Sequence, residues 1–338
     1  MLADDVDDVF DYFDSHGLGD GLPIVPPTPR RVAAFLDHLG DRYGWNADDV
    51  IAVLPPSMGM ATVEKIVINS VMAGCRPEHV PLVAAAIRAV ADPRFNARSI
   101  QVTSNPAAVM VLVNGPIRND VGINSGANCM GQGTRANVTI GRAVRLLLLN
   151  IGGSKVGVVD KAVHGFPGKI SFCFGENEED SPWNPLHVDL GFEPEQSTVT
   201  VVAAHGTSNI LTHGRPIAAD LLPALAYGMV NPGANNFTQG GGEPHLVLNP
   251  SHAQALAADG VTKRTLQSYL YETARVPLDW YTAREREVSR MDEHAIEGKM
   301  PITDDPANII VTVAGIAGSH STFIPTFADS RMVTIAVE

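Results

Sequence analysis

Residues 111–153 read VLVNGPIRNDVGINSGANCMGQGTRANVTIGRAVRLLLLNIGG and join an apolar run, a glycine-rich loop and a long helical pattern. The run at 111–113 predicts a β-strand, and the pattern at 134–150 predicts a helix that ends before Gly152. Loop N–H groups and the positive end of a following helix together bind anions, and glycine lets a ligand approach closely. The stretch therefore predicts a small-molecule site in an α/β protein. The loop glycines stand at positions 122, 126, 131 and 133.

The chain has 338 residues, more than one average domain. We expect one large unit or two intimately joined α/β subdomains, divided into 1–150 with the glycine-rich loop and 151–338 with several histidines at strand ends. A hydrophobic content of 45% is ordinary for a globular protein and allows a sizeable core.

The net charge is −13, and the longest basic tract is Arg30-Arg31. This acidic balance argues against nucleic acid and against an anionic membrane surface as partners. The apolar run at 146–149 is too short to span a bilayer. We therefore expect a small-molecule ligand and a homo-oligomer rather than a membrane or nucleic-acid partner.

The beginning of the chain is acidic, whereas a secretory signal begins with basic and apolar residues. The cysteines at positions 75, 129 and 173 are odd in number, widely spaced and form no CxxC pair. A cytoplasmic protein with reduced thiols is the simplest interpretation.

Strand-like apolar runs alternate with helical patterns along the chain, which favours an α/β fold with mixed or mostly parallel sheets and helices on both faces. The predicted strands are 50–54, 99–103, 111–113, 170–174, 199–204, 245–248 and 308–313. The predicted helices include 1–22, 29–38, 62–73, 81–91, 134–150 and 218–230.

Four predicted strands end in a polar tip, at Asn114, His205, Asn249 and Gly315. Open sheets bind ligands beyond the carboxyl ends of their strands. We therefore expect these tips around one crevice.

Arg135 stands near the start of the helix that follows the glycine-rich loop, where a cation opposes the helix dipole. Binding of a carboxylate or phosphate by its planar fork would explain the position, and a salt bridge to an acid is the alternative. Asn114, Asn124 and Asn128 are further candidates for substrate contact, although loop asparagines also satisfy turn geometry.

Glu178 is the candidate general acid or base among three glutamates that precede Trp183. A loop carboxylate beside tryptophan can have a raised pKa, although an exposed acidic loop is the plain alternative.

Histidines near strand ends are candidates for acid–base chemistry, with His205 first and His320 second, while His252 is a candidate for substrate contact. Capping of the strands by hydrogen bonds to loops is the alternative. The spacings contain no HxH, HExxH or CxxC, so no metal ligands are assigned and no cofactor is predicted.

Cys129 lies in the glycine-rich loop before a helix, a position that can lower a thiol pKa and create a nucleophile. The alternative is a small residue that fills a tight loop.

Several segments, read together, resemble a bacterial family grouped with the UGSC-type (seleno)proteins. The resemblance covers nearly the whole chain, but the Sec/Cys-Gly-Ser-Cys motif of that group is absent here. It implies an α/β fold and a bacterial cytoplasmic setting but no reaction. Because the motif is absent, a thiol-redox role is not inherited, and any redox partner protein would have to carry the motif itself. The segments are DGLPIVPPT (20–28), AGCRPEH (73–79), residues 124–142, EEDSPW (178–183) and residues 246–257.

The leading functional hypothesis is an enzyme, a lyase or hydratase, that binds a small carboxylate or acyl compound and transfers protons with a histidine and Glu178. One alternative is a metal-dependent hydrolase or lyase that uses the scattered histidines. The other is a non-catalytic subunit of a thiol-redox partner enzyme.

Overall fold

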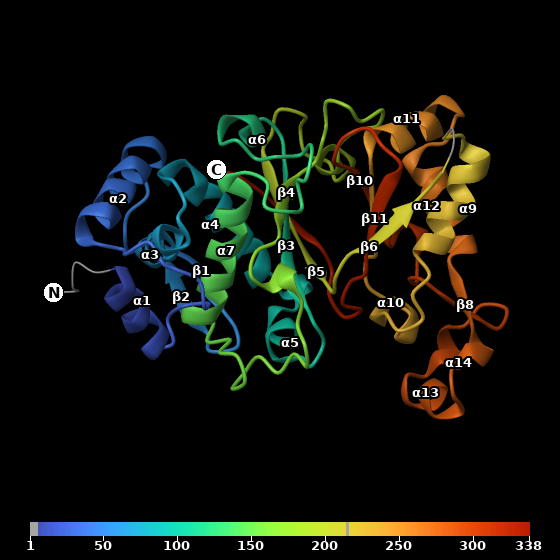
Figure 1. Ribbon diagram of the computed structural model, residues 1–338, viewed down its shortest axis with the longest axis horizontal. Helices are drawn as coiled ribbons and strands as arrows, with labels where there is room; N and C mark the ends of the chain where they lie inside the picture. The colour runs from blue at the N-terminus through green and yellow to red at the C-terminus, as the bar shows by residue number, and fades with distance from the viewer. Residues whose placement is uncertain (1–5, 214–215) are drawn as a thin grey trace.

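The computed structural model describes residues 6–213 and 216–338, which form an α/β fold around two four-stranded sheets (Figure 1). Both sheets mix parallel and antiparallel neighbours, which confirms the predicted class. The first sheet has the spatial order β12 (Val333–Ala336), β5 (Thr198–Ala204), β3 (Ala108–Asn114) and β4 (Cys173–Gly175). The second has the order β10 (Ile310–Val313), β7 (His245–Leu248), β11 (His320–Ile324) and β6 (Ser208–Leu211). Two small pairs join β1 (Val50–Leu54) to β2 (Gly59–Thr62) and β8 (Arg275–Pro277) to β9 (Lys299–Pro301).

Helices flank the sheets along the chain. Those before β5 are α1 (Val6–Ser15), α2 (Pro29–Tyr43), α3 (Val63–Ala73), α4 (Val80–Ala91), α5 (Ala97–Val102), α6 (Ile117–Asp120), α7 (Arg135–Asn150) and α8 (Leu186–Asp189). Those after β6 are α9 (Ala218–Gly228), α10 (Asn235–Thr238), α11 (Pro250–Ala258), α12 (Lys263–Thr273), α13 (Ala283–Val288) and α14 (Met291–His294). Short 3-10 turns occupy Pro77–His79, Pro93–Phe95, Pro167–Lys169, Leu278–Trp280 and Pro306–Asn308. Across the described ranges, no helix combines the length and apolar character needed to cross a bilayer.

The two sheets face each other, and helices cover their outer faces, so the molecule has a helix–sheet–sheet–helix order (Figure 1). Successive side chains of a strand point to opposite faces. On β3, Val111 and Val113 pack with the outer helices α4 and α7, while Met110 and Leu112 enter an inner core shared with Ile310 of the second sheet. The helices therefore cover one face of each sheet, and the other face is buried by the opposite sheet.

Local sequence signals explain the well-predicted helices. Helix α3 begins after Thr62, whose hydroxyl accepts from the Lys65 N–H, and it ends at Gly74, which adopts the left-handed conformation that glycine permits. Helix α7 is the long pattern expected at 134–150, and it buries Ile140 and Val144 against the first sheet.

Several predicted elements differ in the structure. Residues 99–103 are not a strand, because α5 covers 97–102 there, and a short apolar run does not distinguish a strand from a buried helical turn. The helix expected at 1–22 ends at Ser15, and its first five residues lie outside the described residues. The expected division at residue 150 is crossed by hydrogen-bonded strands, because β3 pairs with β4 and β5.

Helix α7 packs closely against the segment at Ser171 and Phe172, and Gly141 in the middle of the helix makes this contact possible. A Cβ there would stand 2.7 Å from the Phe172 backbone nitrogen and would also collide with the Ser171 hydroxyl. We expect Gly141→Ala to destabilise the fold by about 1–3 kcal/mol, although alanine has the higher helix propensity. Urea unfolding would measure this loss. Gly40→Ala in α2 is the matched control, since its Cβ would meet the Trp45 carbonyl at an ordinary 3.6 Å and should stabilise by up to about 1 kcal/mol. A stabilising Gly141→Ala change would contradict the packing.

Candidate functional site

The carboxyl ends of four strands lie along one edge of the paired sheets, which we call the polar edge and define by Asn114, Glu176, Asn249 and Gly315. Strand β3 is parallel to β4, and β7 is parallel to β10, so each pair ends on the same side. The Asn177 N–H donates to the Val313 carbonyl at 2.7 Å, which joins the end of β4 to the end of β10. The edge lies at the top of Figure 1, near α6 and α11. Three of the four polar tips expected from the sequence therefore meet.

His205 is the exception, and its expected place beside the other tips is wrong. Strand β5 runs antiparallel to β3, with Ala204 opposite Ala108, so β5 ends at the opposite side of the sheet from Asn114. The His205 ring packs edge-on against Phe327, with 5.6 Å between ring centroids. Burial lowers the pKa of His205 to about 4, and its Nε2 atom has no hydrogen-bond partner. These contacts give His205 a structural position between the two sheets.

A carboxylate cluster, defined as Asn114, Arg118, Glu176, Glu178 and His187, occupies one part of the polar edge. Glu178 Oε1 accepts from Asn114 Nδ2 at 2.9 Å and from the Gly115 N–H at 2.8 Å, and it lies 3.1 Å from Arg118 Nε. Glu176 Oε2 accepts from Asn114 Nδ2 at 2.7 Å and from the Leu186 N–H at 2.8 Å. Of the three expected glutamates, Glu178 is thus held by several donors, while Glu176 is fully buried.

The cluster is short of hydrogen-bond donors. Burial raises the pKa of Glu176, against the opposing charge of Lys263 and the donors on its carboxylate. Asn114 Oδ1, Glu176 Oε1 and His187 Nδ1 are buried without a partner, and all three can accept a hydrogen bond. His187 Nε2 lies 3.3 Å from the Pro194 carbonyl, which can only accept, and His187 Nδ1 lies 4.0 Å from Glu178 Oε1. An added proton or a hydroxyl-bearing molecule would satisfy these acceptors.

A histidine cluster, defined as Thr212, Asn249, His252, His320 and Ser321, occupies the rest of the polar edge. The His252 imidazole lies between two hydroxyls, with Nε2 2.9 Å from Thr212 Oγ1 and Nδ1 2.8 Å from Ser321 Oγ. Asn249 caps α11 by accepting the His252 N–H, and its amide donates to the His320 carbonyl at 2.8 Å. His320 is exposed, and its Nδ1 lies 2.9 Å from Asn209 Oδ1. The cluster therefore combines a buried imidazole with an exposed one.

Burial and the nearby His320 charge lower the pKa of His252, whose residue surface is 1% exposed. A histidine with a lowered pKa is neutral at physiological pH and can accept a proton. Thr212 is half-buried and therefore connects this imidazole with the surface.

The glycine-rich loop reaches the polar edge through Ser125, whose carbonyl accepts from the Gly315 N–H at 2.8 Å. Asn137 of α7 holds the loop in shape by accepting the Asn124 N–H and donating to the Asn124 and Cys129 carbonyls. The Asn124 side chain bonds within its own turn, to Gly126 and Ala127, and Asn128 has a left-handed φ of 57°. Both asparagines thus match the turn alternative.

Arg135 and Arg142 make different contacts from the same helix. Arg135 is exposed, and its guanidinium donates to the Gly74 carbonyl at 2.8 Å and the Cys75 carbonyl at 3.5 Å. Arg142 forms a two-point ion pair with Asp20, with both nitrogen–oxygen distances 2.8 Å. In this structure Arg135 therefore anchors the turn that follows α3, and both of these bonds go to backbone carbonyls rather than to a member of the histidine or carboxylate cluster.

The expectation of a lowered thiol pKa at Cys129 is wrong. Burial raises the pKa of Cys129, although backbone N–H groups, including that of Gly315, oppose the shift. Burial also raises the pKa of Cys75 to about 12 and raises that of Cys173. Thiols of this kind hold little thiolate at neutral pH.

Within residues 6–213 and 216–338, no group of three or more histidine, cysteine or acidic side chains has the arrangement of a metal site. Sequence patterns had not singled out Arg118, Asn137, Thr212 or Ser321, which the structure brings to the polar edge or its loop. These residues stand in no motif, and their roles come from contacts between distant segments.

A cavity of about 590 Å³ adjoins the carboxylate cluster, since Leu186 lines it and donates to Glu176. Trp183 and Lys263 also line it, and the Lys263 ammonium bonds to Asp189 at 2.7 Å. A smaller cavity of about 250 Å³ lies against the outer side of the glycine-rich loop at Met130, Gly131 and Gln132. Comparison of the chain with protein families, curated proteins and solved structures finds no match in any of the three.

Proposed function

We propose that the chain is an enzyme that transfers protons on a small carboxylate or acyl compound at the polar edge, as a lyase or hydratase does. The observation that carries the proposal is the His252 imidazole between the Thr212 and Ser321 hydroxyls, at 2.9 and 2.8 Å. A general base needs an unprotonated imidazole within hydrogen-bond reach of the group that it deprotonates. Burial lowers the pKa of His252 and so keeps it unprotonated.

In this proposal the proton passes from substrate or water to His252 through the Thr212 hydroxyl. Ser321 fixes the ring by bonding to Nδ1, in the way that a third group orients the base of a catalytic triad. His320 is exposed, stands next to Ser321 in the chain, and is the second acid–base group in this proposal. Glu178 belongs to the carboxylate cluster and reaches the surface with a side chain that is 15% exposed.

An anionic substrate is supported by the position of His252 in the first turn of α11. The N-terminus of a helix carries partial positive charge and favours a carboxylate. The carboxylate cluster would return a proton to the product, because its buried acceptors favour a protonated state.

The test is hydrogen exchange in D₂O, followed by NMR, with a panel of small oxo and hydroxy carboxylates and their thioesters. We expect the wild type to exchange the hydrogen next to the carbonyl of at least one compound, and His252→Gln to slow this about 100-fold or more. His16→Gln, at an exposed site directly after α1, is the control and should leave the rate unchanged. Failure of the wild type to exchange or dehydrate any compound, or an unchanged rate in folded His252→Gln, would refute the proposal.

Acyl transfer is the second candidate, because Thr212 Oγ1 and His252 Nε2 form a nucleophile–base pair. The two reactions differ in whether an acyl group becomes attached to the chain. Incubation with p-nitrophenyl acetate would give acetyl-Thr212 by mass spectrometry for acyl transfer, retained in Thr212→Ser and lost in Thr212→Val. Absence of the acetylated species, together with exchange in D₂O, would leave the lyase or hydratase proposal.

No contact among the described residues favours the metal-dependent alternative or the non-catalytic subunit of a thiol-redox partner. The resemblance to UGSC-type proteins stays a proposal about ancestry, and it adds no group to the site.

A further inference from the structure

A second polar site lies away from the polar edge, near the beginning of β3 and beneath the loop that joins α7 to β4. The loop groove, as we call it, has a volume of about 900 Å³. Arg145, Asp160 and Lys169 form its largely buried charged part and take no part in the proposed reaction, and Lys161 is an exposed cation on its lining. Its remaining lining includes Leu149, Val156, Val163, Phe166 and Ile170.

The charges in the loop groove do not balance. Asp160 pairs with both cations, through Lys169 Nζ at 2.7 Å and Arg145 Nη2 at 3.1 Å. Asp20, the other acid that lines the groove, is bound at two points by Arg142. Arg145 and Lys169 therefore share one carboxylate, and the exposed Lys161 on the lining adds a further cation, so the groove has a surplus of positive charge for an anion.

Both cations are largely shielded from water. The side chains of Arg145 and Lys169 are 12% and 15% exposed, and that of Asp160 is 6% exposed. Burial lowers the pKa of Arg145 and of Lys169, while Asp160 opposes the shift in each case. A partly buried cation without a full partner is costly, so an anionic ligand would be bound favourably here.

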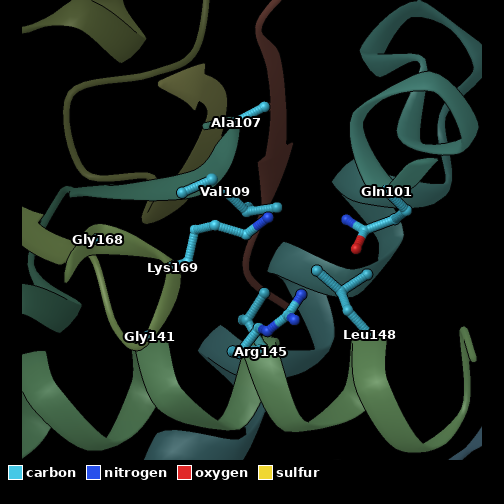
Figure 2. Close-up of a pocket in the computed structure, with 10 residues that line it drawn as sticks. Gln101, Ala107, Val109, Gly141, Arg145, Leu148, Gly168 and Lys169 are labelled. Carbon is cyan, nitrogen blue, oxygen red and sulfur yellow. The ribbon is translucent and has the colours of Figure 1, made fainter. Parts of the chain in front are cut away.

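The position of the cations limits how deeply a ligand can enter. Figure 2 shows the ends of Arg145 and Lys169 entering one small space that Val109, Gln101 and Leu148 also line. The space enclosed behind them is about 10 Å³, which is enough for about one water molecule. The anionic group of a ligand would therefore stop at these two side chains, and the rest of it would lie in the wider groove.

The wider groove offers apolar contact. Val156 and Val163 are 74% and 70% exposed, and Ile170 is 45% exposed. Apolar side chains clustered beside a partly buried charge favour a ligand with an anionic head and an apolar body.

We propose that the loop groove binds a small organic carboxylate with an apolar tail, of the size of a medium-chain fatty acid. Arg145 and Lys169 bind the carboxylate, and the valines and Phe166 cover the tail. This site is separate from the polar edge, because Val109 lies near the start of β3 and Asn114 lies at its end.

Calorimetric titration with octanoate, acetate and octanol measures separately how much the carboxylate and the apolar tail contribute to affinity. We expect octanoate to bind at least about 100-fold more tightly than acetate, because each buried methylene contributes about fourfold. Octanol should bind at least about 10-fold more weakly than octanoate, since it lacks the charge that Arg145 and Lys169 recognise.

Substitutions of residues that line the loop groove test whether octanoate binds there. Lys169→Gln and Arg145→Gln should each weaken octanoate at least about 10-fold, and Asp160→Asn should strengthen it, because the competing carboxylate is lost. Val163→Ser changes only an exposed side chain and should weaken octanoate severalfold without affecting acetate. Lys299→Gln, at an exposed site in β9, is the control for loss of one positive charge.

The proposal is overturned if octanoate shows no saturable binding by about 10 mM. It is also overturned if Lys169→Gln and Val163→Ser bind octanoate like the Lys299→Gln control. Neither result depends on the reaction at the polar edge, so failure here and failure of the proposed function are separate outcomes.

Discussion

Replacement of Arg118 by methionine is expected to lower the free energy of unfolding by about 3–5 kcal/mol. Arg118 is 2% exposed, and its guanidinium lies 3.1 Å from Glu178, bonds to Glu179 at 2.9 Å and donates to the Glu176 carbonyl at 2.7 Å. Removal of one partner of a buried ion pair leaves uncompensated charge, which costs more than the pair itself is worth. Urea unfolding monitored by circular dichroism would measure the effect.

The control is Arg284→Met, in which an arginine with a 77% exposed side chain loses its surface pair with Glu287. That change should stay within about 0.5 kcal/mol. Glu178→Gln combined with Arg118→Met should recover part of the loss, because the carboxylate left unpaired is then neutral. A small effect of Arg118→Met, close to that of the surface control, would show that the carboxylate cluster does not depend on this cation.

Acid should destabilise the protein steeply below neutral pH. Burial lowers the pKa of His79 and His205 to about 4 and that of His245 to about 3, from an ordinary 6.5. Well above pH 6.5 these groups are neutral in both states and have no effect on the pH dependence of stability. Below it the unfolded chain takes up protons that the folded chain resists, so each histidine removes about 1.4 kcal/mol of stability per pH unit down to its folded pKa. Glu176 acts with the opposite sign, because its raised pKa favours protonation in the folded state.

Urea unfolding at pH 7, 6, 5 and 4 measures this slope, and one substitution isolates a single histidine. His205→Phe should reduce the slope by about 1.4 kcal/mol per pH unit, because phenylalanine fills the same place beside Phe327 and cannot take up a proton. His16→Phe, at an exposed histidine, is the control and should leave the slope unchanged. A free energy of unfolding that stays constant from pH 7 to pH 5 would show that the buried histidines do not control acid stability.

The elements that the sequence predicts well are those with long periodic patterns and clear ends. Helix α7 has sixteen residues of apolar periodicity, and α3 has a threonine cap and a closing Gly74, so both stand close to their predicted bounds. The segment at 99–103 failed because a few apolar residues fit a strand and a buried helical turn equally well. The periodicity of a sequence does not tell whether two neighbouring strands are parallel or antiparallel. For this reason His205 was expected beside Asn114, although β5 runs antiparallel to β3.

The sequence indicated the polar edge as a place where these side chains gather, but it did not indicate their contacts. Strand-end positions brought Asn114, Glu178, His252 and His320 to the polar edge, as the rule for sheet edges suggests. The partner of each side chain lies far away in the sequence: Ser321 is 69 residues from His252, and the Arg135 guanidinium bonds to a carbonyl 61 residues earlier. The fold alone determines such distant pairings, and no local motif announces them.

The place of β12 at the outer side of the first sheet has a consequence for synthesis. Strand β5 is buried along its whole length and pairs with β12 through Val201 and Val333, with residues 205–332 made in between. A nascent chain therefore carries β5 with one backbone edge unpaired and its buried side chains partly uncovered while the second sheet is being translated. Open strand edges of this kind are the surfaces on which chains aggregate and to which chaperones bind. A released chain that ends at residue 332 should consequently depend on chaperones, even though it contains all four strands of the second sheet.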